Sequence, residues 1–170
     1  MPRVNTVKKS RKDQGPCSKC GKEIKKGDGY LYWEFAFGPT YKRCAEPGCR
    51  PTASDLTRSE YLKAVYDLQD RKIEGPFIED MKLDVENLIS DIQDLGSEQE
   101  DKLSNMPDSL QSAPSGELLQ ERIDQCQDVV SQLESIDFDI DEEDAKDEDK
   151  LSDKIEEIKN AVQDALGSLA

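Results

Sequence analysis

The sequence contains no histidine, and this absence excludes most familiar enzyme sites. Without an imidazole the chain cannot build a Ser-His-Asp or Cys-His catalytic arrangement or an H-E-x-x-H metal site. The phosphate-binding loops G-x-x-x-x-G-K-[ST] and G-x-G-x-x-G are missing as well. Carboxylates are frequent, but none lies in the apolar sequence context that acid–base catalysis requires. We therefore expect a protein that is not an enzyme.

Apolar residues are also scarce. Hydrophobic residues make up 35% and aromatic residues 6% of the 170 residues, whereas charged residues make up 36%. One ordinary compact globule needs more apolar residues than this. A small metal-stabilised module followed by helices with narrow apolar stripes fits better, because such helices need few core residues. No apolar run approaches the roughly 18 residues of a membrane span, and no signal-peptide core follows the basic start. We expect no membrane contact and a cytoplasmic location, or a nuclear one in a eukaryote.

The charge is divided unevenly along the chain. Residues 1–50 carry twelve Lys and Arg against five acids, and residues 51–170 carry eleven basic against 33 acidic residues. The net charge of −15 therefore combines a basic start with a strongly acidic remainder. Such asymmetry indicates two parts with different partners.

Four of the five cysteines lie in two close pairs near the start of the chain. Cys17 and Cys20 form a C-x2-C pair, and Cys44 and Cys49 form a C-x4-C pair. Because reduced thiols are expected without export, the pairs favour metal over disulfides. Two such pairs predict a tetrahedral structural Zn²⁺ site. Cys126 lies far away in a helical pattern and is interpreted as a small apolar core residue.

An aromatic strand and its return strand separate the two cysteine pairs. The segment 30–37 is rich in β-formers, and its alternation places Leu31, Trp33, Phe35 and Phe37 on one face. Gly38-Pro39-Thr40 is a turn signal, after which residues 41–43 can return as the partner strand. The resulting hairpin would bring Cys44 back towards Cys17. The strand aromatics would form either the modest core of the ribbon or a base-stacking platform.

The run from Cys17 to Gly27 is similar to the opening of zinc-ribbon modules, including the PARP-type zinc finger with its C-x2-C-x-x-x-I-x-x-G start. In that family a His-x2-Cys pair after an aromatic strand completes the site, whereas Cys44 and Cys49 occupy that place here. The resemblance covers about 35 residues. It implies a structural zinc and recognition of DNA.

Beyond residue 56 the pattern becomes helical. A capping box at Thr57-Arg58-Ser59-Glu60 predicts the start of a helix, and Gly75-Pro76 predicts its end. Three later segments carry apolar residues in a heptad-like 3-4 spacing. The seam residues are Ile78, Met81, Val85, Leu88, Ile92 and Leu95; Leu119, Ile123, Cys126, Val130 and Leu133; and Leu151, Ile155, Ile158, Val162, Ala165 and Leu169.

A single amphipathic helix cannot bury its own stripe. We expect an antiparallel helical hairpin or bundle, with a homodimeric coiled coil as the alternative. The predicted fold class is a small β zinc ribbon followed by a mainly α region of acidic amphipathic helices. Its predicted parts are a flexible basic arm (1–14), the zinc ribbon (15–53), a connecting helix (54–75), a long amphipathic helix (76–106), a linker (107–116), an amphipathic helix (117–136), an acidic linker (137–150) and a C-terminal amphipathic helix (151–170).

The acidic linker superficially resembles an EF-hand loop that starts at Asp137. Its sixth position is Glu142, where the sharp turn of that loop needs glycine. We interpret the segment as a solvated linker.

These features predict a non-enzymatic, zinc-binding adaptor or accessory factor. Its basic ribbon would contact DNA, RNA or another partner, and its acidic helices would assemble or bind protein. The candidate nucleic-acid contacts are Lys8, Lys9, Arg11, Lys12, Lys42 and Arg43. The alternative is an acidic protein-interaction or inhibitor module that mimics DNA, of a phage-encoded kind, in which the zinc ribbon is purely structural.

Overall fold

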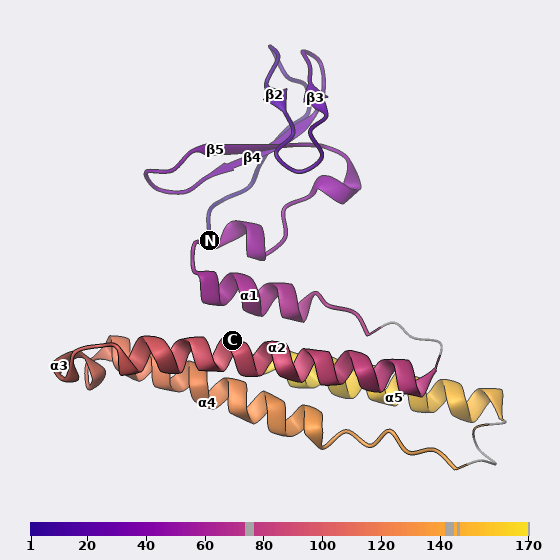
Figure 1. The fold of residues 1–170 in the computed structure, drawn as a ribbon. Helices are drawn as coiled ribbons and strands as arrows, with labels where there is room; N and C mark the ends of the chain where they lie inside the picture. The colour runs from indigo at the N-terminus through magenta and orange to yellow at the C-terminus, as the bar shows by residue number, and fades with distance from the viewer. Residues whose placement is uncertain (74–76, 142–144, 146, 170) are drawn as a thin grey trace. The chain divides into compact units, whose positions relative to one another are not determined.

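The computed structural model describes residues 1–73, 77–141, 145 and 147–169 (Figure 1). It divides into two compact units, which are described separately. Met1–Lys63 is called the head, and Ala64–Ala170 is called the helical unit. A small antiparallel β region is thus followed by a mainly helical region, as the fold class predicted in outline.

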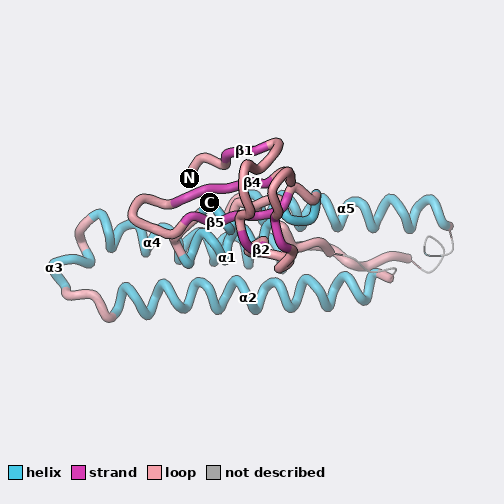
Figure 2. Tube along the Cα trace, turned by 90° about the horizontal axis from the view of Figure 1, so that it is seen from above, coloured by secondary structure: helices cyan, strands magenta, loops and turns pink. Residues whose placement is uncertain are grey.

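Five short strands form the head: β1 (Asn5–Val7), β2 (Gly15–Pro16), β3 (Glu23–Ile24), β4 (Tyr30–Glu34) and β5 (Thr40–Cys44). Figure 2 shows β1, β4 and β5 side by side in that order, as one antiparallel sheet. β2 and β3 form a separate antiparallel pair. The register places Tyr30 opposite Cys44 and Trp33 opposite Tyr41. The predicted β-hairpin is confirmed.

The predicted flexible arm at residues 1–14 is wrong. Asn5–Val7 pairs with Tyr30–Tyr32, and the Ser10 side chain is buried. The backbone of Ser10 is also held, because its N–H donates to the Asp28 carbonyl at 2.8 Å. An unpaired edge of β4 would leave backbone hydrogen-bonding groups open, and this segment satisfies them. Local composition does not report such a distant pairing.

The predicted strand 30–37, with alternate residues facing the core, is found only in its first part, β4. Trp33 is 1% exposed and stacks on Tyr41 with a centroid distance of 5.5 Å. β4 ends at Glu34, however, and Phe37 lies in the following turn with a φ of 60° and a fully exposed ring. Phe37 therefore does not share the buried face of Trp33. Trp33 belongs to the core and is not part of an open stacking platform.

Two short 3₁₀ turns, η1 (Pro47–Cys49) and η2 (Ser54–Leu56), lead from β5 to α1 (Glu60–Gln69). The hydroxyl of Ser59 accepts a hydrogen bond from the Leu62 N–H at 3.3 Å. The cap of α1 is thus Ser59, two residues after the predicted cap at Thr57, and the Thr57 hydroxyl instead accepts a hydrogen bond from the Ser59 N–H. The predicted stop at Gly75-Pro76 lies outside the described residues.

The helical unit contains α2 (Ile78–Ser104), α3 (Asp108–Gln111), α4 (Pro114–Glu134) and α5 (Glu148–Gly167). The predicted linker 107–116 is thus partly helical, since α3 lies within it and α4 begins at Pro114, a residue suited to the first turn. Asp147 caps α5 by accepting the N–H groups of Asp149 and Lys150. None of the helices in the described residues is long and apolar enough to cross a membrane.

The predicted apolar seams are the buried faces of α2 and α4. Every predicted seam residue of these two helices is buried, and the helices pack against each other (Figure 1). α2 continues through Gly96, where an added Cβ would lie 3.2 Å from the Cβ of Cys126 on α4. Gly96 therefore permits a close approach and does not end the helix.

α5 packs against α4, and the later part of its predicted seam is buried. Ile158, Val162 and Ala165 are buried, whereas Leu151 and Ile155 are only half-buried. The side-chain amide of Gln69 donates to the carbonyls of Leu166 and Leu169, at 3.1 and 2.6 Å. This contact joins the end of α1 to the end of α5.

Candidate metal centre

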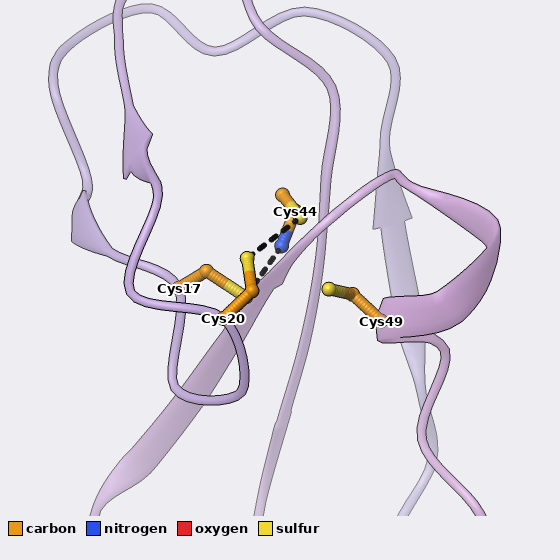
Figure 3. Close-up of side chains that lie close together, drawn as sticks. All are labelled: Cys17, Cys20, Cys44 and Cys49. Atoms are coloured by element: carbon orange, nitrogen blue, oxygen red, sulfur yellow. Dashed lines mark hydrogen bonds between the residues drawn. The ribbon is translucent and has the colours of Figure 1, made fainter.

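Four cysteine side chains meet at one point in the head (Figure 3). Cys17 and Cys20 lie in the turn between β2 and β3, Cys44 ends β5, and Cys49 ends η1. Their sulfur atoms all lie within 4.8 Å of one another. The two pairs of the sequence are thus brought together by the β-hairpin between them.

The first pair is shaped by a tight turn that needs glycine. Gly21 has a φ of 73°, and its N–H donates to the Cys17 carbonyl at 3.0 Å. An L-residue with a side chain rarely adopts this conformation. The Cys17 N–H donates to the Lys22 carbonyl at 2.8 Å, which closes the turn around the sulfurs.

The second pair is shaped by the 3₁₀ turn between its members. The Cys49 N–H donates to the Glu46 carbonyl at 2.9 Å, so the four intervening residues curl back on themselves. Glu46 also accepts a hydrogen bond from the Lys22 ammonium at 2.8 Å, which links the two turns. The hydrogen bond and charge of Lys22 hold the pKa of Glu46 below its usual range. The longer C-x4-C spacing is therefore compatible with a shared site.

The sulfur positions fit a tetrahedral ion. A Zn–S bond of about 2.3 Å places neighbouring sulfurs about 3.8 Å apart in a tetrahedron. The Sγ atoms of Cys20 and Cys44 are 3.7 Å apart. All four cysteines are free thiols. The Cys44 N–H donates to the Cys17 sulfur at 3.3 Å, as backbone amides do around bound thiolates.

The acidities of the thiols differ within the cluster. Burial raises the pKa of Cys17, but the backbone N–H groups of Cys20, Cys44 and Lys19 outweigh it and lower the pKa to about 6. Burial is the main cause that raises the pKa of Cys44. The hydrogen bond with Cys44, followed by burial, raises the pKa of Cys49 to about 12. Because neighbouring thiolates repel one another, full ionisation of the cluster requires a cation.

The surroundings indicate a structural site. Cys17, Cys44 and Cys49 are buried together with Ile24, and Tyr30 packs against them. Four protein ligands leave no open position for a water or substrate, which is the pattern of structural zinc sites. The bound ion would add the interactions that this small apolar cluster lacks. Cys126 belongs to the helical unit, where it is buried in α4.

The six predicted nucleic-acid contacts do not share one environment. Lys8, Lys9, Arg11 and Lys12 are exposed. Lys42 is half-buried, and its ammonium lies 3.5 Å from the Gln14 carbonyl. The four exposed cations and the half-buried Lys42 stay candidates for contact with an external partner. Arg43 has other contacts.

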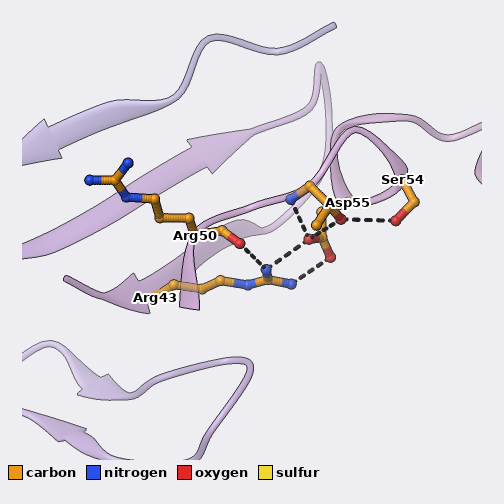
Figure 4. A network of polar contacts seen from close by, with 5 residues as sticks. Arg43, Arg50, Ser54 and Asp55 are labelled. Atoms are coloured by element: carbon orange, nitrogen blue, oxygen red, sulfur yellow. Dashed lines mark hydrogen bonds and ion pairs between the residues drawn. The ribbon is translucent and has the colours of Figure 1, made fainter. Parts of the chain in front are cut away.

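Arg43 is engaged inside the head (Figure 4). Its guanidinium binds both carboxylate oxygens of Asp55, donates to the Arg50 carbonyl at 3.3 Å and lies 5.2 Å from the Trp33 ring centre. The Arg43 side chain is only 9% exposed. Arg43 therefore holds the segment after Cys49 against β5 and has little surface for a phosphate.

Sequence reasoning missed Asp55, the partner of Arg43. Burial opposes ionisation of this carboxyl, but the hydrogen bonds from Arg43 and Thr52 hold its pKa below the usual range. The signal was weak, because one acid in an acidic chain does not stand out. The Asp-containing turn after a Thr was the only local cue.

The acidic linker has few described contacts. Asp137 accepts a hydrogen bond from the Asp139 N–H at 2.9 Å and pairs with Lys154 at 3.5 Å. Glu142, the position that excluded an EF-hand, lies outside the described residues.

Comparison with known proteins leaves the cysteine geometry as the main guide to function. No protein-family model matches the chain, and no curated protein or solved structure is significantly similar to it. The two features from which a function can be proposed are the four-cysteine cluster at metal-binding distance and the helical unit with buried apolar seams.

Proposed function

We propose that residues 15–53 form a zinc ribbon in which Cys17, Cys20, Cys44 and Cys49 hold one structural Zn²⁺. The observation that carries the proposal is the convergence of the four sulfurs within 4.8 Å. The similarity of residues 17–27 to the opening of PARP-type zinc fingers agrees with it. Membership of that family remains a prediction from the sequence.

The zinc ribbon is proposed to serve a non-enzymatic adaptor or accessory factor. A closed four-thiolate site supports a structural role and offers no reactive position. The head presents exposed cations, which suit nucleic acid or another acidic partner. The acidic helices are proposed to bind protein.

The helical unit is proposed to form an antiparallel helical hairpin, with α5 as a third helix. Its support is that the seams of α2 and α4 are already buried within one chain. A homodimeric coiled coil would use the same seams between two chains, so this burial favours the intramolecular arrangement.

Metal analysis of the purified protein tests the zinc site. We expect one zinc ion per chain, and Cys49→Ser should lose it because a tetrahedral site then lacks a ligand. The matched control is Cys126→Ser, which removes a buried thiol from the helical unit and should keep the metal. A wild-type protein without tightly bound metal would refute the proposal.

Chelation tests what the metal stabilises. A strong chelator should unfold the ribbon and change the fluorescence of Trp33, the only tryptophan. The far-UV circular dichroism of the helical unit should persist, because its core contains none of the four ligands. An unchanged Trp33 signal after metal removal would show that the ribbon does not depend on the ion.

A second candidate function is an acidic inhibitor or protein-interaction module. Its supporting observation is the excess of 33 acidic over eleven basic residues in 51–170. This excess exceeds what solubility needs, and self-repulsion opposes compact packing. Capture of a basic partner protein should be lost when residues 77–170 are deleted. Capture by the head alone would reject this candidate.

A further inference from the structure

Two basic segments of the head, residues 8–12 and 25–28, lie side by side, although twelve residues separate them in sequence. The Ser10 N–H donates to the Asp28 carbonyl at 2.8 Å, and the Gly27 N–H donates to the Ser10 carbonyl at 2.9 Å. This pairing places residues 8–12 along the turn at residues 25–28. The exposed cations of the two segments, here called the basic tip, are Lys8, Lys9, Arg11, Lys12, Lys25 and Lys26.

The backbone of the basic tip is held firmly by internal hydrogen bonds. The Ser10 hydroxyl is hydrogen-bonded to the Lys12 carbonyl, and the Gln14 amide donates to the Ser10 hydroxyl at 3.0 Å. The Lys26 N–H donates to the Asp13 carboxylate at 2.8 Å, which bridges the two segments again. A fixed backbone lowers the entropy lost when the tip binds a ligand.

The charge of the basic tip is not balanced within the molecule. None of its six cations forms an ion pair in the described part of the chain. The two acids nearby, Asp13 and Asp28, accept backbone N–H groups of Lys26 and Lys25. Six like charges on two adjacent turns repel one another, and an external polyanion would relieve this repulsion.

The basic tip has no aromatic side chain on which a base could stack. Residues 8–14 and 25–29, all of them described, contain no aromatic side chain. Tyr30, which follows the second segment, is half-buried against the cysteine cluster. Trp33 is buried, and the exposed Phe37 lies beyond the opposite end of β4. Recognition of a nucleic acid at the tip would therefore depend on phosphates.

We infer that the basic tip binds the phosphate backbone of double-stranded nucleic acid without reading its sequence. The inference rests on the proposed zinc ribbon, which would hold the tip in shape, and it names the partner of the head. A DNA duplex presents one phosphate per about 1.7 Å of helix axis, a dense row of negative charge that several cations of the tip can contact together. Binding of single strands usually adds aromatic stacking, which the tip lacks.

Fluorescence anisotropy with a labelled, random-sequence DNA duplex of about 20 base pairs tests the inference on the zinc-loaded full chain. If about four phosphates are contacted, a fourfold rise in salt should weaken binding roughly 100-fold. Lys12→Gln and Lys26→Gln should each weaken binding about five- to tenfold near 0.1 M salt and make the salt dependence shallower. The unlabelled duplex should compete better than a single strand of equal length.

Matched controls distinguish a failure of the zinc ribbon from a failure of the basic tip to bind DNA. Lys63→Gln removes an exposed cation of the same unit outside the tip and should leave binding unchanged. Zinc content and Trp33 fluorescence are measured for each variant, so that loss of the ribbon is separated from loss of contact. A zinc-loaded, folded chain that ignores the duplex overturns the inference but not the zinc site. Equal effects of Lys63→Gln and Lys26→Gln, or a preference for the single strand, also overturn it.

Discussion

Phe37 adopts a backbone conformation that is unfavourable for an aromatic residue. Its φ of 60° costs roughly 1 kcal/mol, and its ring is fully exposed, so contacts within the head do not offset this cost. Phe37→Asn should therefore raise the free energy of unfolding of the head by up to about 1 kcal/mol, because asparagine tolerates this region better. Urea denaturation followed by Trp33 fluorescence measures the change.

The neighbouring Phe35 supplies the control. Its ring meets Tyr41 edge-on at 6.1 Å and lies 5.0 Å from the Arg58 guanidinium. Phe35→Asn removes these contacts and should destabilise the head. If both substitutions lower stability to the same extent, strain at Phe37 is not the reason.

Asp55 predicts a pH dependence of the stability of the head. Its folded-state pKa is lowered, so the carboxylate contributes stability above its unfolded pKa near 4, and this contribution is lost as the pH falls through the folded value. Asp55→Asn should cost about 2 kcal/mol at pH 7, since Arg43 loses its charged partner.

Urea denaturation of wild type and Asp55→Asn at saturating zinc measures this dependence. The difference in the free energy of unfolding between wild type and Asp55→Asn should stay constant from pH 7.5 to about 5. It should become smaller below about pH 4. A difference that grows on acidification would contradict the assignment.

Single residues were predictable where their spacing carries the chemistry. The meeting of Cys17 and Cys20 with Cys44 and Cys49 could be predicted, because short cysteine pairs around a hairpin have few other uses. The internal ion pair of Arg43 with Asp55 could not be predicted. Whether an arginine faces solvent or an internal carboxylate depends on the path of the chain after Cys49, which local sequence does not determine.

At the scale of one helix, Gln99 breaks the apolar seam of α2. It continues the spacing that runs from Ile78 to Leu95, and it is fully buried. Its amide nitrogen lies 3.4 Å from the Leu95 carbonyl, and its amide oxygen has no partner among the described residues. A buried polar atom without a partner reduces stability. Gln99→Leu should therefore raise the free energy of unfolding of the helical unit by about 1 kcal/mol.

Far-UV circular dichroism during urea denaturation measures the effect of Gln99→Leu. Leu88→Ala serves as the reference, because it empties a fully buried seam position and should cost about 3 kcal/mol. A destabilised Gln99→Leu protein beside a normally responding Leu88→Ala protein would show that the amide is satisfied or needed.

The elements show where local pattern succeeds and where it fails. The seams of α2 and α4 were predicted correctly, because a periodic stripe reports burial directly. Strand β1 and the helical turn α3 were not predicted. β1 exists because β4 offers it a free edge, and α3 lies in a segment whose Ser, Pro and Asp residues favour a loop.

For the whole molecule, the acidic excess predicts a salt effect on the helical unit. Residues 64–170 carry 31 acidic against nine basic residues, the acids repel one another, and salt screens this repulsion. Raising sodium chloride from about 0.02 to 0.5 M should raise the Tm of the helical unit by a few degrees. Thermal melting followed by far-UV circular dichroism measures it. An unchanged or lower Tm would mean that the acids are already compensated.

One sulfur differs from its three neighbours in a way that affects the lifetime of the entire head. Cys20 is exposed, whereas Cys17, Cys44 and Cys49 are buried. Small chelators and oxidants reach a closed thiolate site through whichever ligand faces the solvent. Exchange of the proposed zinc ion and oxidation of its ligands should therefore begin at Cys20, and shielding of this single sulfur by a bound partner would slow both reactions.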